Sequence, residues 1–458
     1  MEDYFIQKLT IKDVRDIKNL EIPLDDNERK HLIITGKNGC GKTSTLEEIN
    51  NLLNKLINNG FATIEAHKKN IKSYKQLIKN TQKNISSYEN NIYRETKNKD
   101  KLNYSDNLNY LSNKQKILQI TNNIKSYNDN IVTMKNNIKS YNDNINLWQK
   151  LIDDFAKVDV LFSNQNEIYK DIVNGKFILA YFKAKRENKQ TIPQTPTKQS
   201  FQKKYDTNFE LNKTFLQYML NLKTTQAFAQ IRNDTIEVEE IGKWFGNFEN
   251  SLKTIFDKDD LKFIFYDKEY KFKIEYEDKS FGLNELSDGY SSLLAIVTEL
   301  ILRMEAHGVK AYDMQGVVLI DEIETHLHVD LQKKVLPFLV SFFPKIQFIV
   351  TTHSPFVLSS LSNAVICDLE KRFITSDLSA YSYDALIESY FDSDKYSKEV
   401  KEKIEVFEKL ADRDDLFDIE QDEYFKLKKY FNTIPTFMAD ELAVKINEIK
   451  LRTMFKVD

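Results

Sequence analysis

Residues 36–43 have the types and spacing needed to hold phosphate groups. The segment reads Gly-Lys-Asn-Gly-Cys-Gly-Lys-Thr and matches the pattern G-x-x-x-x-G-K-[ST]. It follows the apolar run at 31–35 and precedes a helical pattern from about 43 to 56, which is the context that such a loop requires. Glycines let backbone N–H groups turn toward an anion, and the helix N-terminus adds a positive dipole. The loop therefore predicts a nucleoside-triphosphate site.

The side chains of this loop have distinct expected roles. Lys42 is expected to reach the β- and γ-phosphates, and Thr43 to place its hydroxyl on Mg²⁺. The other loop residues are expected to surround the phosphates mainly with their backbone: Gly36, Lys37, Asn38, Gly39, Cys40, Gly41 and Ser44. ATP and Mg²⁺ are therefore the expected cofactors.

Two carboxylates follow a second apolar run. Residues 316–320 read Gly-Val-Val-Leu-Ile and are followed by Asp321 and Glu322. Asp321 is expected to hold the Mg²⁺ shell, and Glu322 to polarise the attacking water as a general base. Alone, such acids are equally typical of solvated groups after a strand, but their position downstream of a phosphate-binding loop favours the catalytic interpretation.

Two further polar segments border apolar elements. LSDGYSS at 286–292 precedes an apolar helical pattern, so Ser287 and Gly289 predict an anion site at a helix N-terminus. Simple N-capping by Ser287 or Asp288 explains the same pattern. QFIVTTHS at 347–354 reads as a buried strand ending in His353, which is able to hydrogen-bond a γ-phosphate or the attacking water. A lone histidine in this place is more often structural.

The elements that position these groups indicate an α/β fold. Residues 4–24 predict two or three short antiparallel strands, and 285–370 alternate helix and strand around a buried sheet. Residues 156–184 predict a β-hairpin turning at Asn174-Gly175, and 261–277 predict another. The other expected elements are a polar linker at 185–204, helices from 206 to about 256, and amphipathic helices over 380–458.

Isoleucines recur every seven residues in two stretches between the loop and the second motif. They stand at 64, 71, 78, 85 and 92, and again at 117, 124, 131, 138 and 145. Aromatic or apolar residues often stand three positions later, at the d spacing of a heptad. We predict an antiparallel helical hairpin with a tip at 94–112 and arms of ~30 residues, or ~45 Å. Two helices of an ordinary bundle are the alternative.

The charge pattern of the first arm has two interpretations. Residues 64–101 carry ten basic side chains against four acidic ones, an excess of six. Such a face either contacts nucleic-acid phosphates or is simply solvated. The whole chain has 458 residues and a net charge of -3, so a general polyanion binder is excluded. The sequence has no run of ~18 apolar residues, so no membrane span is predicted. The start of the chain has no secretory pattern, and Cys40 and Cys367 are distant, so we expect a cytoplasmic protein without disulfides or zinc.

The order of the four motifs resembles the ABC-type ATPase heads of the SMC, Rad50, RecF and OLD class, over roughly residues 1–60 and 260–370. The resemblance implies an ATPase whose heads dimerise around ATP. In such heads Ser287 and Gly289 of one protomer would contact the γ-phosphate bound by the other, and His353 would be the switch histidine. The glutamine of the Q-loop has no secure counterpart, and Gln165 is the best candidate.

The residues after Asp321 and Glu322 narrow the resemblance. Glu324, His326 and His328 are similar to the E-x-H-L-H element of RecF- and OLD-like ATPases. Together with LSDG, TTHSP and a short coiled coil, this resembles the ATPase subunits of the Septu, retron and PARIS anti-phage systems. The resemblance implies a homodimer or higher homo-oligomer, a separately encoded nuclease or toxin effector of HNH or Toprim type, and a nucleic acid or phage protein as trigger.

The alternative is a RecF/SMC-like ATPase of DNA repair or chromosome maintenance, which DNA binding by the heads or arms would distinguish. A transporter subunit is disfavoured by the helical insertion. The expected fold is an α/β P-loop NTPase head of ABC type with an antiparallel β subdomain. The expected domains are an N-terminal lobe at 1–60, a coiled-coil hairpin at 61–152, a β-hairpin, linker and helical subdomain at 153–260, a C-terminal lobe at 261–378, and a helical, partner-docking region at 379–458.

Overall fold

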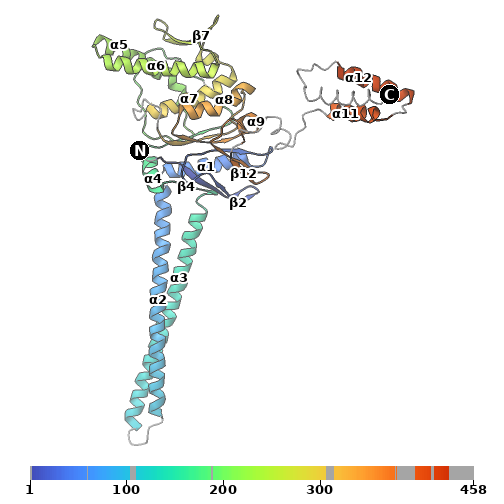
Figure 1. Cartoon of the computed structure of the whole chain (residues 1–458). Helices are drawn as coiled ribbons and strands as arrows, with labels where there is room; N and C mark the ends of the chain where they lie inside the picture. The colour runs from blue at the N-terminus through green and yellow to red at the C-terminus, as the bar shows by residue number, and fades with distance from the viewer. Residues whose placement is uncertain are drawn as a thin grey trace. The chain divides into compact units, whose positions relative to one another are not determined.

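A computed structural model of the chain describes residues 3–58, 60–103, 110–186, 189–305, 314–376, 378, 398–413 and 417–432. The chain divides into two compact units, Met1–Ala380 and Tyr381–Asp458. The first unit contains the sheets and the long helical arms (Figure 1). No helix in the described part of the chain is both long and apolar enough to cross a membrane.

The central sheet of the first unit has six strands in the order β12-β11-β3-β10-β9-β5. All neighbouring pairs are parallel except β11 and β12. The five parallel strands are buried along their whole length, as expected for a sheet covered on both faces. Their bounds are β3 His31–Thr35, β5 Ile178–Phe182, β9 Gly316–Ile320, β10 Ile346–Thr351 and β11 Ala364–Asp368, with β12 at Phe373–Ser376. The loops that carry the motifs follow β3, β9 and β10, so they all lie at the edge of the sheet formed by the carboxyl ends of its parallel strands.

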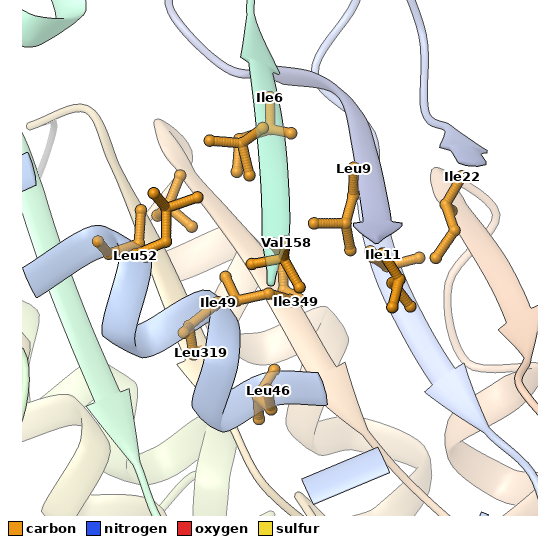
Figure 2. Packing of buried hydrophobic residues seen from close by; sticks show 14 of the residues in the cluster. Ile6, Leu9, Ile11, Ile22, Leu46, Ile49, Leu52, Val158, Leu319 and Ile349 are labelled. Atoms are coloured by element: carbon orange, nitrogen blue, oxygen red, sulfur yellow. The ribbon is translucent and has the colours of Figure 1, made fainter. Parts of the chain in front are cut away.

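A small antiparallel sheet lies on the other side of the loop-bearing helix. It has the order β2-β1-β4, with β1 at Ile6–Val14, β2 at Ile17–Pro23 and β4 at Val158–Phe162. Helix α1 (Lys42–Ile57) shares one buried core with both sheets. Figure 2 shows Ile49 of α1 close to Val158 of the small sheet, and both Leu46 of the same helix and Leu319 of the central sheet belong to the same buried cluster. The predicted N-terminal strands and the helix after the loop are confirmed.

The predicted hairpin at 156–184 is wrong. β4 pairs with β1, whereas β5 pairs in parallel with β9, and helix α4 (Gln165–Val173) joins them. Asn174 caps that helix, and Gly175 follows with φ +72°. A left-handed glycine after a helix is as regular as one in a hairpin turn, so the Asn-Gly pair alone does not distinguish the two.

The two heptad stretches form an antiparallel pair of helices, α2 (Gly60–Asn103) and α3 (Tyr110–Asp153) (Figure 1). Ring pairs join the helices along their length, at His67–Trp148, Tyr74–Tyr141 and Tyr88–Tyr127. Each helix has 44 residues, so each arm is about 66 Å long. The predicted tip at 94–112 is too long, since α2 continues to Asn103 and α3 begins at Tyr110. A helix extends beyond its last apolar contact because adding a residue to an existing helix needs no apolar partner.

The remaining elements of the first unit are a three-stranded antiparallel sheet and several helices. The predicted strand pair at 261–277 is confirmed by β6 and β7, and β8 extends it. The helices are α5 Phe215–Ile231, α6 Thr235–Phe256, α7 Asp288–Glu305, α8 Val329–Phe342 and α9 Pro355–Leu358, with 3-10 turns η2 Asn212–Thr214 and η3 Leu283–Glu285. The strands are β6 Lys262–Tyr266, β7 Lys271–Tyr276 and β8 Lys279–Gly282.

The second unit contains two helices in its described part, α11 (Lys398–Ala411) and α12 (Asp418–Asn432). They pack through a small core that includes Phe407 and Phe431. The helices predicted over 380–458 are confirmed for these two segments, and the rest of that range lies outside the described residues.

Candidate nucleotide site

The loop between β3 and α1 has a backbone that only glycine adopts without strain. Gly36, Gly39 and Gly41 have φ of +132°, +86° and +101°. A Cβ on Gly36 would also lie 2.8 Å from the Cys40 sulfur and 3.3 Å from Oδ1 of Asp368. The loop therefore has the tight, inward-turning backbone that presents N–H groups to an anion.

Lys42, the first residue of α1, folds back over this loop. Its side chain is buried, and Nζ donates hydrogen bonds to the carbonyl oxygens of Gly36 at 2.8 Å and Lys37 at 3.1 Å. Burial lowers the pKa of Lys42, while the nearby carboxylates of Glu322 and Glu324 oppose that shift. The ammonium is thus held at the mouth of the loop, where phosphate oxygens are able to replace the two carbonyls.

Thr43 and Asp321 meet although they are 278 positions apart in the sequence. The Thr43 hydroxyl donates to Oδ1 of Asp321 at 3.2 Å, and the Thr351 hydroxyl donates to the same oxygen at 2.6 Å. Asp321 is only 4% exposed. A hydroxyl and a buried carboxylate supply hard oxygen donors of the kind that Mg²⁺ prefers, so these two residues fit the predicted cation.

Glu322 turns the chain sharply out of the sheet. Its φ is +42°, its N–H donates to the Thr351 hydroxyl at 2.7 Å, and its carboxylate accepts from the Thr325 hydroxyl at 3.3 Å. A non-glycine residue in the left-handed region is strained, and such strain is concentrated at functional sites. The turn places the side chain of Glu322 beside Asp321 and leaves it partly accessible to solvent.

His353 follows β10 on the same edge of the sheet. Its backbone N–H donates to the Glu324 carboxylate at 2.5 Å. Burial lowers the pKa of His353 below its usual 6.5, and the positive charge of Lys42 lowers it further. The imidazole is therefore neutral near pH 7, with one nitrogen able to donate and the other able to accept.

Arg186, which the sequence did not single out, also contributes to the site. It follows β5 and donates to the carbonyl oxygens of Asp321 at 2.7 Å, Glu322 at 3.2 Å and Ile323 at 3.3 Å. Nε also donates to the Ser292 hydroxyl at 2.9 Å, and burial lowers the pKa of Arg186 to about 10. One guanidinium thus fixes the backbone after β9 and ties it to α7.

Arg186 was not among the predicted site residues, because it stands among several lysines with nothing to single it out. Its only signal was its place just after an apolar run at 178–182. Gln165, the candidate Q-loop residue, begins α4, which packs against α1 and β4. The residues after β9 are contacted instead by the segment that follows β5, through Arg186.

The LSDGYSS segment lies against a different turn. Ser287 is exposed immediately before α7, and Gly289 is buried. A Cβ on Gly289 would lie 2.8 Å from the carbonyl oxygen of His326, so the helix start and that turn are in close contact. His326 itself has φ +65°. Lys42 and Thr43 thus lie near the carboxylates of Asp321 and Glu322 of the same chain, whereas Ser287 is exposed on the surface.

A second acidic turn borders the phosphate-binding loop. After β11, Glu370 accepts from the backbone N–H of Lys37 at 3.2 Å and pairs with its ammonium at 3.2 Å. Asp368 is buried and accepts from the N–H groups of Glu370 and Lys371, both at 2.9 Å. This turn braces the loop from the side opposite Asp321.

Comparison with known proteins gives a family match over most of the chain. The model of the AAA ATPase domain matches residues 5–358. The Septu protein PtuA of Bacillus mycoides (strain KBAB4) is 37% identical over 131 residues, which is 25% of this chain and 18% of that protein. The retron Ec83 probable ATPase of Escherichia coli is 28% identical over 175 residues, which is 35% of this chain and 32% of that protein.

The chain therefore spans less than a third of the length of these curated relatives. Among solved structures, the Smc head domain with an extended coiled coil from Pyrococcus furiosus covers 85% of this chain and 99% of its own. Its sequence identity to this chain is 10% and its TM-score is 0.31.

Proposed function

The chain belongs to the AAA ATPase domain family, and from this premise we propose that it is the ATP-hydrolysing subunit of a bacterial anti-phage defence complex. The observation that carries the ATPase assignment is the 3.2 Å contact between Thr43 and the buried Asp321, beside Lys42 and Glu322. The defence role rests on the similarity to a Septu protein and a retron ATPase.

We propose that ATP binds with its phosphates in the loop at 36–43. The loop N–H groups and the Lys42 ammonium then hold the β- and γ-phosphates. Mg²⁺, held by Thr43 and Asp321, would neutralise charge that develops on the phosphate oxygens. Thr351 keeps Asp321 in place through its 2.6 Å hydrogen bond, so the carboxylate is positioned before any ligand arrives.

In this proposal Glu322 is the general base. Its strained turn directs the carboxylate out of the sheet edge, where it accepts the proton of the attacking water. The neutral imidazole of His353 donates a hydrogen bond to the γ-phosphate or to that water. Glu324 is a positioning residue, because its carboxylate fixes the backbone of His353.

The exposure of Ser287 supports a composite site. We propose that two heads face each other, so that Ser287 and Gly289 of one protomer complete the phosphate site of its partner. A homodimer, or a higher homo-oligomer built from it, would then depend on ATP. Of the five proposed domains, residues 61–152 form an arm, and residues 379–458 form the docking region for a separately encoded nuclease or toxin.

The native mass of the complex tests this proposal. The chain, purified from cells that also express its neighbouring genes, should give a dimer or a multiple of it with ATP and Mg²⁺, together with a co-purifying effector. The Lys42→Ala variant, even with ATP and Mg²⁺ present, should have the mass that the wild-type complex has without ATP. A monomer that keeps the same mass with and without ATP would contradict the composite site, and an effector-free dimer that binds DNA would favour a repair role.

A further inference from the structure

The two flanks of the helical arm differ in charge. With the recurring isoleucines at heptad position a, positions b and e form one flank of each helix, and positions c and g form the other. Over residues 63–91 of α2 and 126–151 of α3, positions c and g hold no charged residue. Over 65–89 and 125–146, positions b and e hold two glutamates, at 65 and 89, and seven lysines, at 68, 72, 75, 79, 125, 135 and 139. Of the two flanks, only one is therefore basic.

The basic flanks of α2 and α3 lie on the same face of the arm. The helices run side by side in opposite directions (Figure 1), and when two antiparallel helices turn their a/d seams toward each other, the e positions of both fall on the same side. The ring pairs between the helices put Lys139 level with position 76 and Lys135 level with position 80. Five lysines thus lie within about 12 Å along the arm. We call them the lysine face: Lys72, Lys75, Lys79, Lys135 and Lys139.

The side chains of the lysine face are exposed and have no ion-pair partner. All five are exposed, and within the described part of the chain no carboxylate lies within ion-pair distance of any of them. By contrast, the nearby Lys68 pairs with Glu65 at 3.0 Å. The other acidic residues of this stretch are Glu89, at its far end, and Asp129 and Asp143, at heptad position f on the outer side of α3. The field of the lysine face therefore favours an anionic partner.

The spacing of these lysines is unfavourable for the helices themselves. Lys75 stands three residues after Lys72 and four before Lys79, and Lys135 stands four before Lys139. Like charges at these spacings are neighbours on the helix surface and destabilise it. The opposite flank of the same helices is solvated by Asn, Ser and Thr, so solvation alone does not require lysine. An anion that neutralises the lysine face would remove this repulsion.

The composition of the lysine face indicates which anion it fits. Over 65–89 and 125–146, positions b and e hold no aromatic residue, so the flank lacks the stacking platform that binders of single strands use. The face offers only ammonium groups, which contact phosphates as point charges and read neither base edges nor a 2′-hydroxyl. A row of phosphates at fixed spacing, as in a DNA duplex, matches a row of lysines on paired helices.

We propose that the lysine face binds the phosphate backbone of double-stranded DNA without regard to base sequence. Each lysine that reaches a phosphate releases condensed counterions, which supplies the affinity and makes it dependent on salt. The proposal goes beyond the ATPase function and uses no residue of the loop at 36–43.

Fluorescence anisotropy with a 5′-labelled DNA duplex of mixed sequence, titrated with the full chain without ATP at several salt concentrations, tests the proposal. The triple variant Lys72→Gln, Lys75→Gln and Lys79→Gln should bind more than tenfold more weakly and have a log–log salt slope smaller by roughly 2.7, since three phosphate contacts are lost. The double variant Lys135→Gln and Lys139→Gln should lose roughly 1.8 of the slope. Circular dichroism should show that both variants keep their helices, because glutamine forms helices as well as lysine does.

The matched control is the triple variant Lys243→Gln, Lys262→Gln and Lys268→Gln. It removes the same charge from exposed lysines that lie outside the arm, and it should keep the affinity and salt slope of the wild-type chain. DNA binding with losses confined to the lysine-face variants supports the proposal. Absence of DNA binding, or equal losses in the control, would overturn it. Tighter binding of a single strand, a duplex RNA or poly-glutamate than of the DNA duplex would overturn the choice of partner.

Discussion

The edge of the central sheet that carries the proposed ATP site and the helical arms are built on opposite principles. At the edge, side chains from distant parts of the chain meet in a buried network, as with Thr43 and Asp321. In the arms, contacts repeat at seven-residue intervals between two neighbouring helices, and most side chains are exposed. The edge therefore depends on a few irreplaceable atoms, while the arm distributes its stability over many similar contacts.

This difference in construction determines where a substitution should act. A change at the edge removes a group that has no substitute, so it should affect the chemistry more than the fold. A change in the arm removes one of many contacts, so it should loosen a local region and leave the chemistry intact. Variants at the edge and in the arm test this division.

Lys42→Ala should abolish measurable ATP binding. The substitution removes the ammonium that faces the loop carbonyls and is proposed to hold the β- and γ-phosphates. Calorimetric titration with ATP and Mg²⁺ measures this, with Lys268→Ala as an exposed control. Tight ATP binding by the variant would remove the loop from the proposed site.

Glu322→Gln should keep ATP affinity and lower kcat about 10²-fold or more, because the amide cannot accept the proton of the attacking water. The variant should also accumulate the ATP-bound dimer, which native mass spectrometry detects. Steady-state hydrolysis measures the rate, and turnover equal to that of the wild-type chain would exclude Glu322 as the base.

Arg186→Lys should lower both stability and hydrolysis. A lysine keeps the charge, but one ammonium cannot reproduce the planar fork that donates to three successive carbonyls. Loss of these charge-assisted hydrogen bonds should reduce the free energy of unfolding by about 2–3 kcal/mol. Urea denaturation and steady-state hydrolysis measure the two effects. A variant with unchanged stability would show that the backbone after β9 needs no such anchor.

Ile131→Ala should act locally in the arm. Ile131 is 7% exposed in α3, and its truncation should cost about 2 kcal/mol of local stability. Hydrogen exchange should speed up in α2 and α3, while hydrolysis should stay within twofold of wild type. Val132→Ala, at a neighbouring exposed position, is the control. A large loss of hydrolysis would contradict the separation of arm and edge.

The pH dependence of hydrolysis should show a small effect of His353. Because burial and Lys42 lower its pKa below 6.5, the imidazole should stay neutral down to that pH and gain its proton only below it. Since the unfolded chain binds this proton more readily, His353 should also lower stability as the pH falls from 6.5. A kcat profile of the wild-type chain beside His353→Asn measures this. A wild-type profile that already falls between pH 8 and 7 would contradict the lowered pKa.

The sequence predicted best what a local pattern determines. The loop at 36–43, the strand before Asp321 and the paired arms each carry their own periodicity or motif. The hairpin at 156–184 failed because strand pairing is a long-range choice, and β5 finds β9 rather than its neighbour β4. Arg186 could not be recognised for the same reason, since its three carbonyl partners lie some 135 residues further along the chain.

The joint between α1 and α2 makes the arm a lever for the nucleotide site. Gly60 begins α2 three residues after α1 ends at Ile57, and a Cβ there would lie 2.6 Å from the Lys55 carbonyl oxygen and 2.8 Å from the Phe155 ring. Such a close-packed joint has little room to absorb a rotation of α1. With an arm of about 66 Å, a tilt of about 5° at this joint would displace the far end by about 6 Å. An ångström-scale adjustment at the phosphates thereby becomes a displacement as large as a helical turn.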